Sequence, residues 1–183
     1  MSYKRWLFIA VFLFSIGLFL GLTTSTGIDD LPTEDITILE DFAESLEQLP
    51  HLSILAIIFI NNVSVLLISF ALSPILCLVP IIALTLNGWL IGLVSATVIQ
   101  EESLGYLLAG ALPHGIFELP ALIMGEAVAL SFGTAVVLAL FKKERRNLPM
   151  LNVRQNLRYL LIALGLLLPA AIIEAYLTPL FLG

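Results

Sequence analysis

The hydrophobic residues of this chain fall into long runs that few polar residues interrupt. The runs cover residues 6–22, 52–99, 103–141 and 159–183. A helix of about 20 apolar residues is long enough to cross the hydrocarbon core of a bilayer. The pattern therefore predicts an all-α protein built as a polytopic bundle of transmembrane helices.

Five spans account for these runs. The second run has no acidic residue, basic residue or histidine, and it is long enough for two crossings. We expect the turn between them at Pro74 and Pro80, because proline interrupts helical hydrogen bonding. The predicted spans are residues 6–22, 52–73, 78–99, 103–141 and 157–178. They form a single membrane domain, residues 1–183, with an acidic segment at residues 23–50.

The basic residues indicate how the spans are oriented. All eight lysines and arginines fall into two groups, one before the first span and one at residues 142–158, from the end of the fourth span to the first residues of the fifth. Short loops rich in lysine and arginine stay in the cytoplasm. We therefore expect a multi-pass protein of the cell membrane with the N-terminus in the cytoplasm, the C-terminus outside, and the acidic residues 23–50 on the outer face.

The fourth run is too long for one straight crossing. It starts outside and must end inside, so it crosses an odd number of times. A straight helix over residues 103–141 would measure about 58 Å, roughly twice the hydrocarbon core. We expect one crossing plus a piece that either re-enters the membrane or lies at its outer surface, with the helix broken between Pro113 and Pro120.

The composition excludes several classes of protein. Of 183 residues, 60% are hydrophobic and only 12% are charged, about half the charged fraction of soluble domains. Fourteen acidic residues against eight basic ones would repel a phosphate backbone, so nucleic acid is not an expected partner. Cys77 is the single cysteine, which excludes an internal disulfide and a cysteine-type zinc site. The sequence patterns of intramembrane hydrolases are missing, and we do not expect an enzyme.

Two patterns of small and apolar residues concern packing. Residues 37–50 have helical spacing of apolar residues and predict a short amphipathic helix, either a solvated linker or a lid over an outer vestibule. Gly17-x-x-x-Gly21 and Gly88-x-x-x-Gly92 allow helices to approach closely. We expect the tightest seam along a row of small residues, either inside the chain or between subunits: Ala121, Gly125, Ala129 and Gly133.

Polar side chains within the apolar runs carry the candidate function. They are Asn61, Asn62, Asn87, His114, Glu118, Glu126 and Glu174. An ionisable side chain at bilayer depth is costly, so such groups usually face the bundle interior, a partner or water. Counted along the spans, the carboxylates belong to the outer half and the asparagines lie deeper. The pattern predicts a polar cavity that is open to the outside and attracts cations.

Several interpretations of these polar residues stay open. His114 and Glu118 are four residues apart on one helix face. They fit a structural pair, a relay for a cation or proton, or part of a metal site with Glu126 or His51. The asparagines also fit hydrogen bonding between helices, and Glu174 also fits an interfacial carboxyl without a further role. Beyond a bound cation, no cofactor is expected.

One string of residues resembles the signature of the stage II sporulation protein M family. The string is Leu112-Pro113-His114-Gly115-Ile116-Phe117-Glu118-Leu119-Pro120-Ala121, and shorter similarities occur at Phe59-Ile60-Asn61-Asn62, at Asn87-Gly88 and at residues 173–179. The resemblance covers about residues 50–179 and implies a multi-span membrane protein. In spore formers the family member helps to organise a peptidoglycan-degrading complex without being the hydrolase; relatives occur in archaea and in bacteria that do not sporulate.

Two functional hypotheses follow. The leading one is a channel- or transporter-like bundle whose outer cavity receives a cation or small solute, with His114 and Glu118 contacting the ion or handling protons. The competing one is a non-catalytic membrane scaffold for a complex that remodels the cell envelope, in which the same polar groups only fasten helices together. Expected partners are the lipid bilayer, other membrane proteins and further copies of the chain.

Overall fold

The fold was analysed in a computed structural model that describes residues 3–24, 49–75, 77–142 and 148–182. Within these ranges the chain is helical and has no strand, which confirms the predicted all-α class. The helices are α1 (Tyr3–Thr23), α3 (His51–Leu72), α4 (Leu78–Glu101), α5 (Leu104–Phe141), α6 (Leu148–Tyr176) and the short α7 (Thr178–Leu182). The amphipathic helix that the sequence predicts at residues 37–50 falls almost entirely outside the described residues.

Five of these helices are long and apolar enough to cross a membrane. They include α1, α3, α4 and α5 over their full lengths, and the segment Arg154–Leu180, which comprises most of α6 and the start of α7. The five predicted spans are thereby confirmed, and their boundaries shift by only a few residues. Helix α5 contacts every other helix and forms the centre of the bundle.

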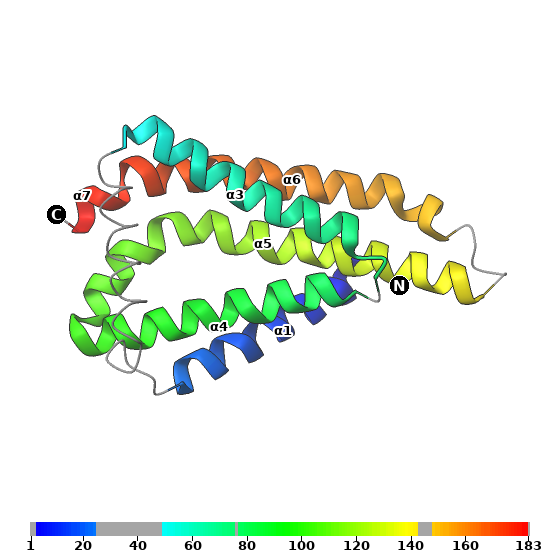
Figure 1. Cartoon of the computed structure of the whole chain (residues 1–183), viewed down its shortest axis with the longest axis horizontal. Helices are drawn as coiled ribbons and strands as arrows, with labels where there is room; N and C mark the ends of the chain where they lie inside the picture. The colour runs from blue at the N-terminus through cyan, green and yellow to red at the C-terminus, as the bar shows by residue number, and fades with distance from the viewer. Residues whose placement is uncertain (1–2, 25–48, 76, 143–147, 183) are drawn as a thin grey trace.

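Helix α5 is bent but not broken. Ser103 begins it, since its Oγ accepts a hydrogen bond of 3.1 Å from the backbone N–H of Tyr106. Pro113 and Pro120 both lie inside one continuous helix, where the sequence predicted an interruption. Figure 1 shows α5 rising from the end of α4 and then turning to run along the bundle. A proline removes one hydrogen bond and bends a helix, and packing against neighbours can preserve the remaining turns.

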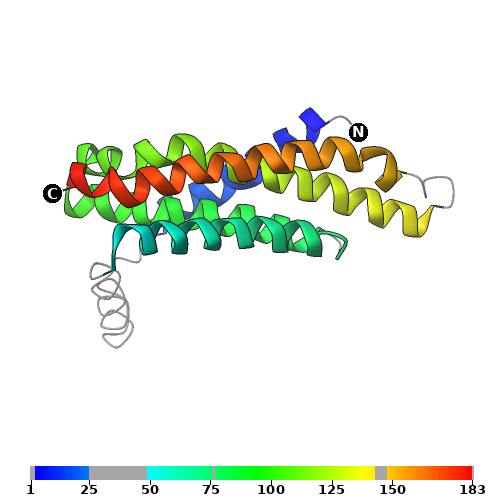
Figure 2. The ribbon, with the colours of Figure 1, turned by 90° about the horizontal axis from the view of Figure 1, so that it is seen from above.

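The two ends of the bundle differ in charge. Figure 1 places the start of α1, the turn between α3 and α4 and the end of α5 at one end, and Figure 2 agrees from a second direction. This end, called the basic end, holds Lys4, Arg5 and Lys142. The opposite end, called the acidic end, holds Glu101 and Glu102 at the end of α4, together with the start of α3 and the C-terminus. Among the described residues, the predicted separation of basic from acidic side chains is thereby confirmed, whereas most of the acidic segment 23–50 lies outside the described residues.

Helices α1 and α4 touch backbone to backbone. A Cβ atom added to Gly17 would collide with the carbonyl oxygen of Thr85, and one added to Gly21 would collide with that of Trp89. The glycines of the α4 motif face the backbone of α1 in the same way. The two glycine motifs therefore pack against each other. Because residue numbers rise together along the contact, the two helices run in the same direction.

The row of small residues on α5 packs inside the chain. All four members are buried: Ala121, Gly125, Ala129 and Gly133. Gly125 lies against the side chain of Leu66, and Gly133 lies against the backbone of Ser73. The row is therefore an internal seam, as one of the two interpretations held. The expectation that it is the tightest seam was wrong, because at Gly125 the neighbour is a side chain, whereas all four glycines between α1 and α4 meet backbone atoms.

Candidate functional site

Three side chains of types that bind metals meet at the acidic end of the bundle. His114 and Glu118 come from α5 and Glu174 comes from α6, and one ligand atom of each lies within 4.8 Å of the others. His114 Nε2 is 3.9 Å from Glu118 Oε2. All three side chains are half-buried. These residues, together with Asn62, are called the His–Glu cluster below.

Three helices build the cluster. The spacing of four residues puts His114 and Glu118 on one face of α5. Helix α6 runs in the opposite direction, so its final turns bring Glu174 beside the beginning of α5 (Figure 1). From α3, Asn62 Nδ2 donates a hydrogen bond of 3.2 Å to Glu118 Oε1. This bond occupies one carboxylate oxygen and leaves the other beside the imidazole.

The cluster has little positive charge to balance its carboxylates. Among the residues that the structure describes, neither Glu118 nor Glu174 forms an ion pair with a lysine or arginine. The described lysines and arginines lie toward the other end of the bundle, and among the described residues His114 is the basic side chain within 4 Å of Glu118. Its Nδ1 atom is buried and has no hydrogen-bond partner within the part of the chain that the structure describes. Two carboxylates this close repel each other unless positive charge or a proton lies between them.

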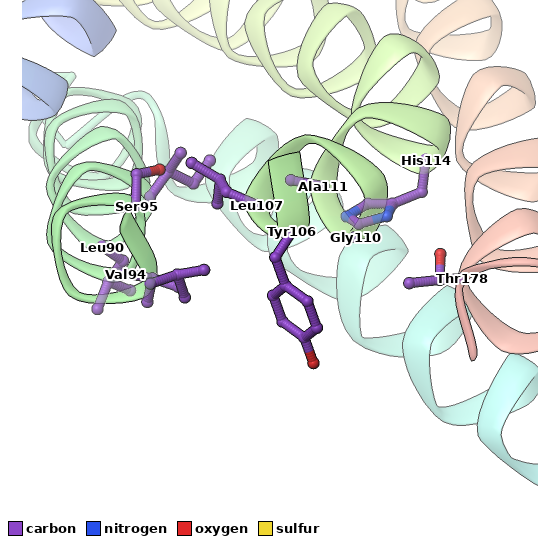
Figure 3. A pocket seen from close by; sticks show the side chains of 11 residues that line it. Leu90, Val94, Ser95, Tyr106, Leu107, Gly110, Ala111, His114 and Thr178 are labelled. Atoms are coloured by element: carbon purple, nitrogen blue, oxygen red, sulfur yellow. The ribbon is translucent and has the colours of Figure 1, made fainter. Parts of the chain in front are cut away.

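An apolar groove borders the cluster. It has a volume of about 390 Å³ and lies between α4, α5 and α7. Figure 3 shows the His114 ring between α5 and Thr178, while Leu90, Val94 and Leu107 supply apolar walls. The His114 side chain lines this groove and is 20% exposed. Its mainly apolar lining differs from the polar cavity that the sequence predicted.

Glu126 forms a separate buried site. It is fully buried, and Ser69 of α3 donates a short hydrogen bond from Oγ to its Oε2 atom. Its Oε1 atom has no hydrogen-bond partner among the described residues. Eight residues of helix put Glu126 about 12 Å from Glu118 along the axis of α5. The pattern of polar residues did not single out Ser69, although a hydroxyl within an otherwise apolar span was a usable signal.

The remaining predicted residues do not join the cluster. Asn61 is exposed, and Asn87 donates to the backbone oxygen of Ala83 in its own helix at 2.8 Å. His51 Nδ1 lies 3.0 Å from the backbone oxygen of Ala175. The suggested metal partners of His114 are thus corrected. Glu174 takes the place of Glu126 and His51, because α6 folds back onto α5 at this level.

The sequence also matches known proteins along nearly its whole length. A family model described as stage II sporulation protein M matches residues 10–179. An uncharacterized protein of Methanocaldococcus jannaschii is 29% identical over 172 residues, which is 93% of this chain and 92% of that protein. No solved structure matches. The matched region contains every residue of the His–Glu cluster, and its helices agree with the multi-span architecture that the signature implies. The chain therefore belongs to the stage II sporulation protein M family.

Proposed function

We propose that this protein is a transporter-like membrane protein that receives a cation at the His–Glu cluster. The observation that carries the proposal is the meeting of His114, Glu118 and Glu174 within 4.8 Å. Ionisable groups inside membrane spans are rare and usually mark ion pathways or proton relays. Two carboxylates and one imidazole give the cluster the charge and the donor atoms that a cation needs.

The packing beyond the cluster favours a transporter-like cycle over an open channel. Between the cluster and the basic end, the core is closed by buried apolar side chains such as Leu66, Leu122 and Leu130. Within this apolar core, the hydrogen-bonded pair of Glu126 and Ser69 is a buried polar site. A cation would therefore cross only if the helices rearranged, as in alternating access.

A scaffold for membrane proteins of the cell envelope is the second candidate. It is favoured by the hydrogen bonds that already engage several of the polar residues, namely Asn62 with Glu118, and Ser69 with Glu126. Such bonds fasten helices together without any ion. In this case other membrane proteins or further copies of the chain would cover part of the apolar surface.

For orientation, we propose that the basic end faces the cytoplasm, as the rule for positively charged loops requires. Single cysteines at two exposed positions test this: Glu102→Cys at the acidic end and Lys142→Cys at the basic end. A membrane-impermeant maleimide should label Glu102→Cys in intact cells and Lys142→Cys only after permeabilisation. The native Cys77 is buried, so the unsubstituted chain serves as the blank. Labelling of Lys142→Cys in intact cells would show that the basic end faces outward and would contradict the proposed orientation.

Flux through the purified protein tests the transport function. In liposomes, the full chain should pass cations, and the double variant His114→Ala with Glu118→Gln should lose most of this flux, because the ligands are gone. The matched control is Glu101→Gln with Glu102→Gln, which removes exposed carboxylates at the same end and should leave the flux unchanged. A chain without specific flux, whose double variant is only less heat-stable, would instead support the scaffold.

A further inference from the structure

We propose that His114, Glu118 and Glu174 form a binding site for a divalent first-row transition metal ion, for which Zn²⁺ and Mn²⁺ are suitable probes. The inference rests on the proposed function, since it names the class of cation that the same cluster takes. One imidazole nitrogen and two carboxylate oxygens make a mixed donor set. Imidazole suits zinc and related metals, and carboxylates are shared by these metals and manganese.

The spacing of the donor atoms fits a small metal ion after a minor adjustment. With metal–ligand bonds of about 2.1 Å and tetrahedral angles, neighbouring donor atoms lie about 3.4 Å apart. His114 Nε2 and Glu118 Oε2 are 3.9 Å apart, and the ligand atoms of all three residues lie within 4.8 Å of one another. Rotation about the side-chain bonds of the two glutamates covers differences of this size.

The charge of the cluster selects a divalent ion. Two carboxylates neutralise two positive charges, whereas a monovalent ion would leave a net negative charge in half-buried surroundings. The ions Mg²⁺ and Ca²⁺ prefer six or more ligands, nearly all of them oxygen. Three protein ligands that include an imidazole, with space left for a water or an exchanging ligand, match the open sites of transition metals.

Asn62 is a positioning residue for this site. Its amide donates to Glu118 Oε1 at 3.2 Å, which orients the carboxylate so that Oε2 faces His114. Groups that hydrogen-bond a metal ligand typically contribute 10–100-fold to metal affinity, an order of magnitude known from other sites. The neighbouring Asn61 is exposed, so it provides a matched control on the same helix.

Metal binding to the full chain in detergent tests the inference. Isothermal titration should find one Zn²⁺ or Mn²⁺ per chain, and Mg²⁺ or Ca²⁺ should not compete. The variants His114→Ala and Glu174→Gln should weaken Zn²⁺ binding by more than about 100-fold, and Asn62→Ala by about 10-fold. Asn61→Ala should bind as the unsubstituted chain does. Circular dichroism checks that each variant keeps its helices.

A second measurement keeps the test valid where a cluster variant folds poorly, because it uses only chains with an intact cluster. Because an ion that binds only the folded state raises its stability, Zn²⁺ should raise the thermal midpoint of the unsubstituted chain and of Asn61→Ala. Absence of both binding and this rise, an unchanged affinity in Glu174→Gln, or equal binding of Mg²⁺ would overturn the proposal. Metal binding without flux in liposomes would support the metal site and contradict the proposed transport function. Cation flux without Zn²⁺ or Mn²⁺ binding would overturn the metal site alone.

Discussion

Replacing Gly88 with leucine is expected to separate α1 from α4 and to leave little folded protein. Even a Cβ atom at this position would collide with the carbonyl oxygen of Phe14. A backbone atom can give way only if its whole helix moves. Overpacking of a well-packed site typically costs about 1–3 kcal/mol, and we expect this variant at or above the upper end of that range.

Thermal unfolding in detergent measures the effect, and Gly165→Leu is the matched control. Gly165 is exposed on α6, and an added Cβ would have no neighbour within 4 Å. The indole of Trp89 gives a second readout, because its Nε1 donates to Thr24 Oγ1 across the contact at 3.2 Å. Its fluorescence should shift to the red only in Gly88→Leu. Equal thermal midpoints of the two leucine variants would contradict the proposed backbone contact.

Removing the hydroxyl of Ser69 is expected to destabilise the bundle through Glu126. The Glu126 carboxyl is fully buried, and Ser69 is its hydrogen-bond donor among the described residues. Ser69→Ala therefore leaves a buried polar group without that partner, which typically costs about 1–3 kcal/mol. Glu126→Gln should cost less, because the amide oxygen can still accept the bond from the hydroxyl.

The double variant Ser69→Ala with Glu126→Leu separates this polar effect from simple loss of packing. When both partners become apolar, no buried polar group is left unsatisfied, so the double variant should be more stable than Ser69→Ala alone. Denaturation of Ser69→Ala, of Glu126→Leu, of the double variant and of the unsubstituted chain forms a thermodynamic cycle whose coupling term measures the interaction of the pair. Additive effects of the two substitutions would show that the Ser69–Glu126 bond contributes nothing.

The residues of the candidate site could be predicted in part. His114 and Glu118 follow from their spacing, because residues four apart lie on one helix face whatever the rest of the chain does. Their partner Glu174 could not be chosen from the sequence, since it is brought to the cluster only by the return of α6 along α5. Asn62 reaches the cluster and Asn61 does not, for a geometric reason. Adjacent residues of a helix point about 100° apart, so only one of them can face the cluster, and the sequence does not say which.

The course of α5 could also be predicted only in part from the sequence. The length of residues 103–141 and its two prolines correctly indicated that the segment could not be one straight span. Whether a proline ends a helix or only bends it depends on the packing around the helix. Here α5 is the most buried of the five described spans, its buried residues begin at Ala121, and the helix continues through both prolines.

By itself, the sequence determined the all-α class, the five spans and the separation of basic from acidic residues, because span length and loop charge are set by the bilayer and act locally along the chain. Only the tertiary structure decided which helix faces meet. It paired the glycine motifs of α1 and α4, placed Glu126 with Ser69, and brought Glu174 to His114 and Glu118. These pairings depend on how surfaces from distant parts of the chain fit together, and no local pattern of residues encodes that fit.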